Sequence, residues 1–335
     1  MQEVIKLSVR VKVPSTTANL GPGYDIMGMA LNLHNYVEIS PLETSQDEGN
    51  EGGLKIEITP AQEIKSRGNY NFEEDIKALS PFEEDDLLLR TIEELEKFCG
   101  TKMRGIKITE ELAVPPARGM GISAAGIAGT LMAAGKYFQL GLSDEEIFYL
   151  TSNLEGHKDN AAAACYGGLN IIVPSQEQHK TFRRRIHPAA NFKIVIVVPE
   201  FSTETKKQRS LLPKNIPHED AVFNLARTSL LPLAIKEGKL EDLRELMRDK
   251  LHQTYRSELI PGWKDLLEKG YSQGAAGIAL SGAGPSLLAF APSRDKGKEI
   301  GESLVKCWDE KNIKASFLLV DPTPAGMQVV KQENK

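Results

Sequence analysis

Short stretches of alternating apolar and polar residues recur along this chain, and a period of two is typical of half-buried β-strands. The pattern is clearest in Ile5–Val13, with the sequence IKLSVRVKV. Similar patterns or short apolar runs predict further strands at Ile26–Ile39, Leu54–Ile58, Met103–Thr109, Leu169–Val173, Phe192–Val198, Ala276–Leu280, Leu287–Phe290 and Ala315–Leu319. The predicted strands are therefore spread over the whole chain.

Helical spacing of apolar residues predicts helices between these strands. Asp85–Phe98 has an amphipathic pattern. Ser143–Leu154 begins with Ser143 as a potential N-cap, and Glu146 stands where a capping box requires an acidic residue. Further helices are predicted at Ala124–Lys136, Asp220–Lys236, Lys239–Leu251 and Trp263–Tyr271.

Polar stretches separate the predicted elements. We expect an exposed loop at Thr44–Gly53, an irregular insertion at Pro60–Pro81, a surface hairpin or loop at Pro174–Pro188 and a frayed tail at Gln332–Lys335. The length of 335 residues is enough for two domains. Because Gln176–Asn191 is polar and lies between two predicted strands, we place the boundary there and expect domains at 1–185 and 186–335.

Composition and charge exclude several classes of protein. The net charge of −5 argues against a nucleic-acid-binding surface. Three cysteines, far apart in the sequence, form neither a zinc spacing nor a disulfide framework. No apolar run is long enough to span a membrane, and the N-terminus lacks the core of a signal peptide. We therefore expect a cytoplasmic protein without a membrane partner.

The glycine-rich stretch Pro115–Gly126, PPARGMGISAAG, is the feature around which the candidate chemistry is arranged. Glycines allow a turn whose N–H groups point into one concave space, and the helix that follows adds the positive end of its dipole. Such a turn is a seat for a polyphosphate, and Ser123 could cap the helix or bind Mg²⁺. The spacing matches neither the Walker nor the Rossmann pattern, and a plain connection into a buried helix is the alternative.

Three other stretches carry polar residues that could line a site. In Pro14–Asp25, PSTTANLGPGYD, Asn19 and Asp25 flank a Gly-Pro-Gly turn, and side-chain capping of that turn is the alternative interpretation. In LEGHKDN a carboxylate such as Glu155 could hold a nucleotide-bound Mg²⁺, or the stretch could simply cap a helix. The stretch Ser281–Ser286, SGAGPS, is a second glycine turn or a tight hairpin.

Arginines could supply the counter-charge for an acidic substrate. Arg209, which follows Thr205, and Arg256, shortly before Pro261, could each grip a carboxylate through two parallel hydrogen bonds. A surface arginine without such a partner is the alternative for each.

In order and content, the three glycine stretches resemble the motifs of the GHMP kinase superfamily, and LEGHKDN followed by CYGG is similar to a stretch of its homoserine kinase family. The resemblance covers nearly the whole chain except Pro60–Pro81. It implies a two-domain α+β fold, with a ribosomal-protein-S5-like N-terminal domain and a ferredoxin-like C-terminal domain. It also implies ATP and Mg²⁺ as cofactors, L-homoserine as the substrate between the domains, a role in threonine biosynthesis, and a homodimer.

The resemblance also implies roles for individual residues of this chain. ATP would contact the loop through Pro115, Arg118, Gly119, Met120, Gly121, Ile122, Ser123, Ala124 and Ala125. Ser123 and Glu155 would hold Mg²⁺. The amino acid would be bound by Asn19, Asp25, His157, Thr205 and Arg256. Catalysis would involve Asn160, Arg209 and Asp159, with Asn160 orienting the hydroxyl and Asp159 a candidate base.

Two residues depart from the family pattern. Ile122 replaces the first serine of the usual pair in the phosphate loop, which removes one hydroxyl near the phosphates. Lys158 replaces a proline beside Asp159, which adds a cation and loosens the backbone. A related kinase of another small hydroxylated acid, or a non-catalytic sensor on this fold, are therefore the alternatives to homoserine phosphorylation.

Overall fold

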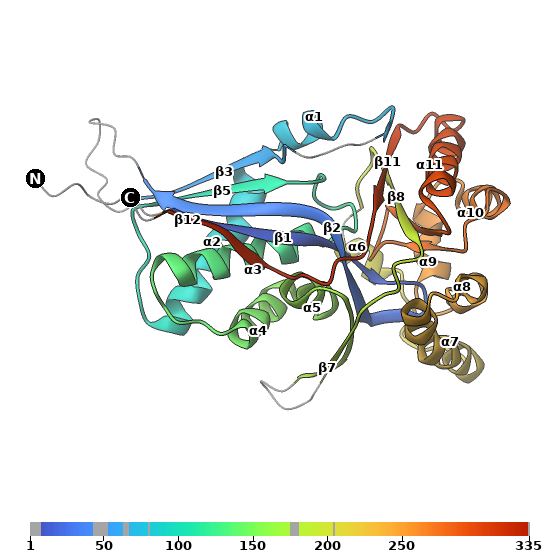
Figure 1. The fold of residues 1–335 in the computed structure, drawn as a ribbon, viewed down its shortest axis with the longest axis horizontal. Helices are drawn as coiled ribbons and strands as arrows, with labels where there is room; N and C mark the ends of the chain where they lie inside the picture. Colours follow the sequence, from blue (N-terminus) through green and yellow to red (C-terminus); the bar gives the residue numbers. More distant parts are fainter. Residues whose placement is uncertain are drawn as a thin grey trace, which may run out of the picture.

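The computed structural model describes residues 8–42, 53–62, 67–79, 81–174, 181–203 and 205–333. The expected loop Thr44–Gly53 lies almost entirely outside the described residues, as do the start of the first predicted strand and the last two residues of the tail. Two sheets with their own covering helices make up the described part of the molecule (Figure 1). Ser8, the first described residue, pairs with Glu333, the last one, in the first sheet.

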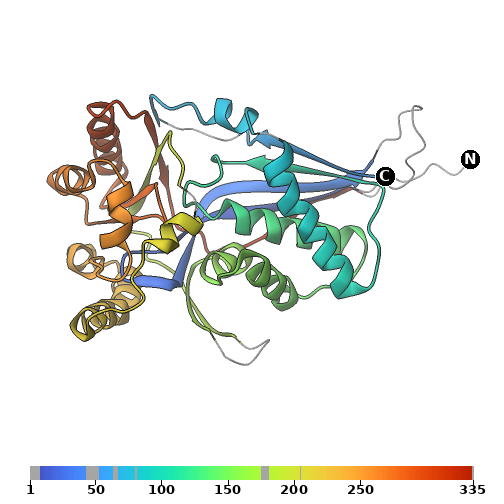
Figure 2. The same cartoon turned by 180° about the vertical axis from the view of Figure 1, so that it is seen from behind.

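The first sheet has the strand order β12-β1-β2-β5-β3, and β6 continues it from β2 to β7. Its strands are β1 (Ser8–Asn19), β2 (Gly23–Pro41), β3 (Leu54–Pro60), β5 (Ile106–Leu112), β6 (Leu169–Pro174), β7 (Thr181–Ile186) and β12 (Gln328–Glu333). The helices α2 (Pro81–Cys99), α3 (Ile122–Tyr137), α4 (Asp144–Glu155) and α5 (Asp159–Tyr166) cover one face of it (Figure 2).

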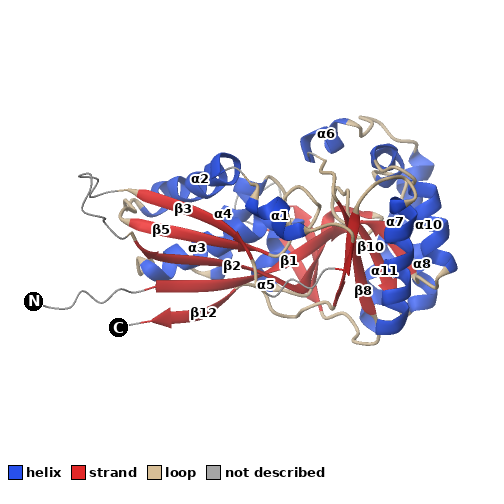
Figure 3. Ribbon diagram, turned by 90° about the horizontal axis from the view of Figure 1, so that it is seen from above, coloured by secondary structure: helices blue, strands red, loops and turns tan. Residues whose placement is uncertain are grey.

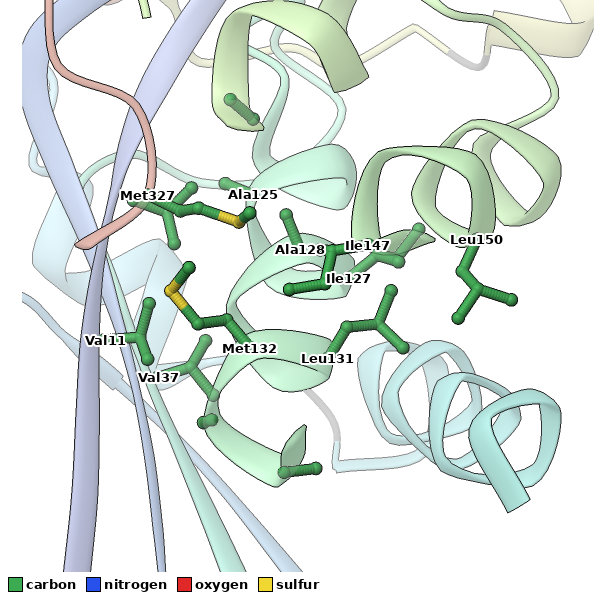
Figure 4. Close-up of a cluster of buried hydrophobic side chains, with 14 of the residues drawn as sticks. Val11, Val37, Ala125, Ile127, Ala128, Leu131, Met132, Ile147, Leu150 and Met327 are labelled. Carbon is green, nitrogen blue, oxygen red and sulfur yellow. The ribbon is translucent and has the colours of Figure 1, made fainter. Parts of the chain in front are cut away.

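The core of this first unit forms where α3 packs against the sheet. Ile127, Leu131 and Met132 of α3 meet Val11 of β1 and Val37 of β2 in one buried cluster (Figure 4). Helix α3 is built mainly of small residues, and a Cβ at Gly129 would lie 2.6 Å from a methyl carbon of Val37. The small residues therefore let α3 lie close to the sheet, which fixes the position of the loop that precedes it.

The second sheet has the order β4-β11-β8-β10-β9, formed by β4 (Arg67–Gly68), β8 (Lys193–Pro199), β9 (Gly277–Leu280), β10 (Leu287–Ala291) and β11 (Ala315–Val320). Around it lie α6 (Thr205–Ser210), α7 (His218–Glu237), α8 (Leu240–Leu246), α9 (Gln253–Arg256), the 3₁₀ turn Ser257–Leu259, α10 (Trp263–Ser272) and α11 (Arg294–Asp309). Alternate residues of β8 enter two cores, because Ile194 and Ile196 face one cluster while Val195 and Val197 face the other.

The two sheets are linked by more than the chain between them. Figure 3 shows the β1–β2 hairpin reaching from the first sheet to the second, and its turn residue Leu20 is buried in the core below β8. Strand β12 returns from the C-terminal half to pair with β1, and β4 joins β11 of the second sheet. Each half of the chain, as divided between residues 185 and 186, thus contributes one strand to the sheet of the other half. The division of the chain into two domains at that point stays a prediction.

Several predicted elements need correction. The described residues of the segment Pro60–Pro81 are not simply irregular, because they include β4 and α1 (Phe72–Lys77), whose Phe72 and Ile76 are buried. Strand β1 continues through Asn19, so the turn expected over Pro14–Asp25 is confined to its middle. The helix expected over Lys239–Leu251 ends at Leu246 as α8. Of the tail, Gln332 and Glu333 belong to β12 rather than being frayed.

The predicted capping box is confirmed. The capping box at the start of α4 is present: Ser143 Oγ accepts from Glu146 N, and the Glu146 carboxylate accepts from Ser143 N at 2.8 Å. None of the described helices combines the length and the apolar character that a membrane span requires.

Candidate active site

A cavity of about 500 Å³ opens where the two sheets approach each other, and segments far apart in the sequence line it. These segments are the β1–β2 turn, the loop before α3, the junction of α4 and α5, and parts of the α1 region, α6, α9 and the Ser281–Ser286 turn. The predicted site residues on its wall are Asn19, Asp25, Pro115, Arg118, Gly119, Met120, Gly121, Ile122, Ser123, Glu155, His157, Asp159, Asn160, Arg209 and Arg256. The structure therefore brings nearly all of them together.

Two of the predicted residues that the structure describes do not line this wall, and the position of a third cannot be compared with it. Ala124 and Ala125 are buried in the first turn of α3. Thr205 begins α6, but its side chain lies outside the described residues.

The glycine loop leads directly into the N-terminus of α3. Gly121 is the N-cap with φ +62°, and no side chain caps the helix. A Cβ at Gly121 would lie 1.8 Å from Thr16 Oγ1, and one at Gly119 would lie 2.1 Å from the Ser281 carbonyl oxygen. Only glycine fits both positions, so the loop is seated against β1 and the second glycine turn, and the helix N-terminus faces the cavity.

Ser123 and Glu155 face each other at the start of α3. Ser123 Oγ donates to Glu155 Oε2 at 2.6 Å. Burial raises the pKa of the Glu155 carboxyl, and His157 together with the Ser123 hydroxyl offsets this only in part. The negative charge of the buried Glu155 carboxylate is therefore only partly balanced by its neighbours. A hydroxyl and a carboxylate of this kind suit Mg²⁺, which prefers oxygen ligands and often takes one or two carboxylates. Within the described ranges, no cluster of three His, Cys, Asp or Glu side chains could hold a metal alone.

A second polar group lies at the start of α5. Asp159 Oδ1 accepts from Asn160 N at 2.8 Å and from His157 Nδ1 at 2.9 Å. Burial lowers the pKa of His157, but its hydrogen bond to Asp159 and the charges of Asp159 and Glu155 outweigh burial, so the pKa is raised. Asn160 Oδ1 accepts from Thr16 Oγ1 at 2.7 Å. The Asn160 amide is thereby held in one orientation.

Arg209 and Asp25, which also line the cavity, form a two-pronged ion pair. Arg209 Nη1 donates to Asp25 Oδ2 and Nη2 donates to Asp25 Oδ1, each at 2.8 Å. Nη1 also donates to the Tyr24 hydroxyl at 2.9 Å. Opposite charges thus stand side by side at the cavity, an arrangement that suits a zwitterion.

Arg256 adds a second cation beneath this pair. Its side chain is buried, and its guanidinium carbon lies 5.1 Å from the centre of the Tyr24 ring. Burial lowers the pKa of Arg256, with Tyr24 and Asp25 opposing that effect. Its Nε has no hydrogen-bond partner among the described residues. A buried cation with a vacant donor on a cavity wall is suited to an anionic ligand group.

Asn19 and Arg118 also brace the walls that they line. Asn19 Nδ2 donates to the Gly282 carbonyl at 2.8 Å, while Asn19 Oδ1 accepts from Asp25 N at 3.0 Å, so the amide joins two turns. Arg118 donates to the carbonyls of Pro199 at 3.2 Å and Glu200 at 2.7 Å. It also reaches the Tyr70 hydroxyl at 3.1 Å. Arg118 therefore ties the glycine loop before α3 to Tyr70, which directly precedes the α1 region, and to the residues after β8.

Sequence reasoning missed Thr16, Tyr24 and His252, all of which contact predicted site residues. Thr16 and Tyr24 lie in the PSTTANLGPGYD stretch, so the motif itself was the signal that could have found them. His252 is four residues before Arg256, a spacing that places both on one side of a helical turn.

Comparison with known proteins identifies the family of the chain. The GHMP kinases N terminal domain family matches residues 86–168, and the GHMP kinases C terminal family matches residues 233–310. A homoserine kinase of Halothermothrix orenii is 37% identical, with 92% of each chain covered. One of Desulfitobacterium hafniense is 34% identical, with 96% of this chain and 100% of that protein covered.

A solved structure supports the fold. The crystal structure of homoserine kinase from Cytophaga hutchinsonii matches with a TM-score of 0.78 at 23% identity, covering 96% of this chain and 97% of the other. The alignments cover nearly the full length of both relatives. The expected GHMP kinase fold is confirmed. The chain belongs to the homoserine kinase family of the GHMP kinases.

Proposed function

We propose that this protein transfers the γ-phosphoryl group of ATP to the side-chain hydroxyl of L-homoserine, giving O-phospho-L-homoserine for threonine biosynthesis. One observation carries the proposal. A single cavity joins an uncapped helix N-terminus on a glycine loop to Asp25, Arg209 and Arg256, a charge set that suits an amino acid. Membership of the homoserine kinase family supports the same reaction.

The backbone of the loop Gly119–Ser123 would hold the ATP phosphates, with Ala124 and Ala125 completing the first turn of the helix. Ser123 and Glu155 would hold Mg²⁺, which neutralises phosphate charge when bound. Glu155 would do so in its ionised form, and its hydrogen bond from Ser123 keeps both oxygens at the same point of the cavity wall. Ile122 supplies no hydroxyl, so phosphate binding at that position depends on backbone N–H groups.

The amino acid would bind at another part of the cavity wall. Asp25 would accept from the ammonium group, while Arg209 and Arg256 would donate to the carboxylate. The Asp25–Arg209 ion pair would open when the zwitterion binds. Asp25 would then exchange Arg209 for the ammonium group, and Arg209 would exchange Asp25 for the carboxylate. Asn160, held by Thr16, would orient the side-chain hydroxyl, and His157 and Thr205 would complete the pocket.

Catalysis by these residues is mainly positioning and charge neutralisation, because phosphoryl transfer needs little covalent help. Arg209, which is affected by the charges of both Asp25 and Asp159, would hold the substrate against the phosphate loop. Asp159 accepts hydrogen bonds from His157 and from the backbone, and it stays the candidate base if one is used. The reaction as proposed does not require it.

The remaining expectations are also proposals. The protein acts in the cytoplasm as a homodimer, a common form for soluble enzymes. The chain is divided near residues 185 and 186 into its two GHMP kinase domains. Size-exclusion chromatography with light scattering tests the dimer, since a monomer at micromolar concentration would contradict it.

The experiment that tests the function is ATP consumption by the purified protein in Mg²⁺, with homoserine, threonine, serine and mevalonate as separate acceptors. Strong turnover of homoserine alone, lost in Arg256→Ala with an unchanged melting temperature, is the expected result. Turnover of another alcohol would identify a related kinase instead. ATP binding without turnover of any acceptor would reject the enzyme and favour a sensor.

A further inference from the structure

His252 is fully buried and contacts Arg256, which lines the cavity. Its two ring nitrogens face different parts of the site. Nε2 is 2.7 Å from the carbonyl oxygen of Gly21, in the turn that carries Asn19 and Asp25. Nδ1 is 3.3 Å from Nη1 of Arg256. The imidazole therefore links the β1–β2 turn to the buried arginine.

These two partners determine where the proton of His252 resides. The Gly21 carbonyl can only accept, so Nε2 must carry a hydrogen. The Arg256 guanidinium can only donate, so Nδ1 must present its lone pair. Both requirements are met by one neutral tautomer, with the hydrogen on Nε2. A second proton, on Nδ1, would turn an N–H toward the N–H of Arg256 and place two cations together in a buried site.

The surrounding groups are consistent with a neutral ring. Asp249 Oδ2 is 3.6 Å from Nε2, beyond hydrogen-bonding distance, and it accepts instead from His252 N at 2.9 Å. The Tyr24 ring is stacked at a tilt, with centroids 5.3 Å apart, and Asp25 beyond it is paired with Arg209. Burial and Arg256 lower the pKa of His252, while Asp249, Gly21 and Asp25 oppose them without reversing the direction.

From this geometry we infer that neutral His252 is a positioning residue that orients Arg256 toward the substrate carboxylate. The inference rests on the proposed function and assigns a role to a residue that does not itself line the cavity. His252 holds Arg256 through Nδ1 and holds the turn bearing Asp25 through Nε2. The binding sites for the carboxylate and the ammonium are thereby kept at a fixed separation.

Two substitutions separate the two contacts. His252→Asn places an amide oxygen near the position of Nδ1 and keeps the acceptor for Arg256. His252→Gln places an amide NH₂ near the position of Nε2 and keeps only the donor to Gly21. We expect His252→Gln to raise the KM for homoserine about tenfold, with kcat within about twofold, because a hydrogen bond to a charged group is lost. We expect His252→Asn to stay within about threefold of the wild-type KM.

The pH dependence of the same constants gives a second readout, measured from pH 5 to 8.5 at saturating ATP and Mg²⁺. Homoserine keeps both charges over this range, and all other titrating groups are shared by wild type and variants. Protonation of His252 at acid pH would disturb its contact with Arg256 and raise the wild-type KM for homoserine. That rise will be absent in His252→Asn. His218→Gln, on the exposed start of α7, is the matched control and will leave both constants unchanged.

Histidine ¹⁵N NMR tests the tautomer without using activity. The chain has six histidines, and the signals lost in His252→Asn identify the one of interest. The expected result is a neutral ring with hydrogen on Nε2 at pH 7. A hydrogen on Nδ1 would overturn the inference.

The kinetic outcomes separate this inference from the proposed function. A wild type that phosphorylates homoserine, with Asn and Gln variants that have equal KM values, would reject the role of His252 and leave the function intact. A wild type that does not phosphorylate homoserine would reject the function, and with it the positioning role.

Discussion

Arg209 and Asp25 are joined by two parallel hydrogen bonds of 2.8 Å, although they are far apart in the sequence and come from α6 and β2. The pair combines the cation and the anion that the proposed zwitterionic substrate would require. Each partner is only partly exposed, with 37% of the Arg209 side chain and 34% of the Asp25 side chain accessible. The pair is thus accessible enough to open for a ligand, and solvent limits its contribution to stability.

Arg209→Lys tests this pair. Lysine keeps the charge but cannot form the two-pronged contact, so we expect kcat/KM for homoserine to fall about 10- to 100-fold. The melting temperature should change little because the ion pair is partly solvated. Steady-state kinetics and thermal unfolding measure both effects. Arg248→Lys, in an exposed pair with Glu245, is the matched control. An unaltered kcat/KM for Arg209→Lys would remove Arg209 from the substrate site.

Glu155→Gln is expected to stabilise the metal-free protein while removing most activity. Because burial raises its pKa, folded Glu155 binds its proton more tightly than the unfolded chain does. The free energy of unfolding therefore carries a contribution that is present below the ordinary Glu pKa of about 4.3 and is lost as pH rises through the folded pKa. Glutamine does not ionise, so the variant does not lose this contribution as pH rises. The melting temperature of Glu155→Gln should therefore exceed that of the wild type by more at pH 8 than at pH 5.

The measurement for Glu155→Gln is thermal unfolding in EDTA at both pH values, with the exposed Glu268→Gln as the control. A lower melting temperature than wild type at pH 8 would show that the ionised carboxylate stabilises the fold. Titration of activity with Mg²⁺ completes the test, since wild-type activity should require more Mg²⁺ as pH falls and protons compete for the carboxylate.

Gly121→Ala should disrupt the phosphate loop, and Gly141→Ala provides a control for backbone strain. Both glycines have positive φ, +62° and +71°. The added Cβ would lie 1.8 Å from Thr16 Oγ1 at Gly121, whereas nothing lies within 4 Å at Gly141. We expect about 1–2 kcal/mol of lost stability at Gly141 from the left-handed conformation alone. At Gly121 we expect a larger loss and a raised KM for ATP, measured by urea unfolding and kinetics. Equal effects at the two positions would argue that the close approach to Thr16 is unimportant.

Asp159→Asn distinguishes positioning from general base catalysis. Loss of a general base costs about 10²–10⁴-fold in rate, and we expect a smaller fall in kcat because the proposed transfer does not depend on one. The same change removes the main partner of His157, so its raised pKa should return toward the ordinary value, as followed by NMR titration. In the wild type, the raised pKa of His157 adds to the free energy of unfolding below the unfolded pKa, and this contribution disappears as pH rises through the folded pKa. Asp159→Asn should remove that contribution. A thousandfold loss of kcat would assign Asp159 as the base.

Local rules were sufficient for much of the fold. Strand alternation located β1 and β3, and the serine and glutamate of the capping box located the start of α4. In one helix whose packing depends on glycines, the pattern was misleading. Helix α11 was missed because Gly297 and Gly301 interrupt its sequence, yet Cβ atoms there would lie 2.7 Å from Leu319 and 2.3 Å from Phe317. Those glycines let the helix pack against the sheet, a reason that exists only in the folded protein.

The sequence by itself determined the motifs, because turns, caps and glycine loops depend on residues that are close along the chain. It therefore located Gly119, Glu155 and Asp25 as candidate groups. Only the tertiary structure decided which groups meet, since the Asp25–Arg209 pair and the link from His252 to Gly21 join distant segments. The burial of the site residues is likewise decided by the tertiary structure. The raised pKa of Glu155 and the neutral ring of His252 depend on exclusion of water by segments that no local pattern brings together.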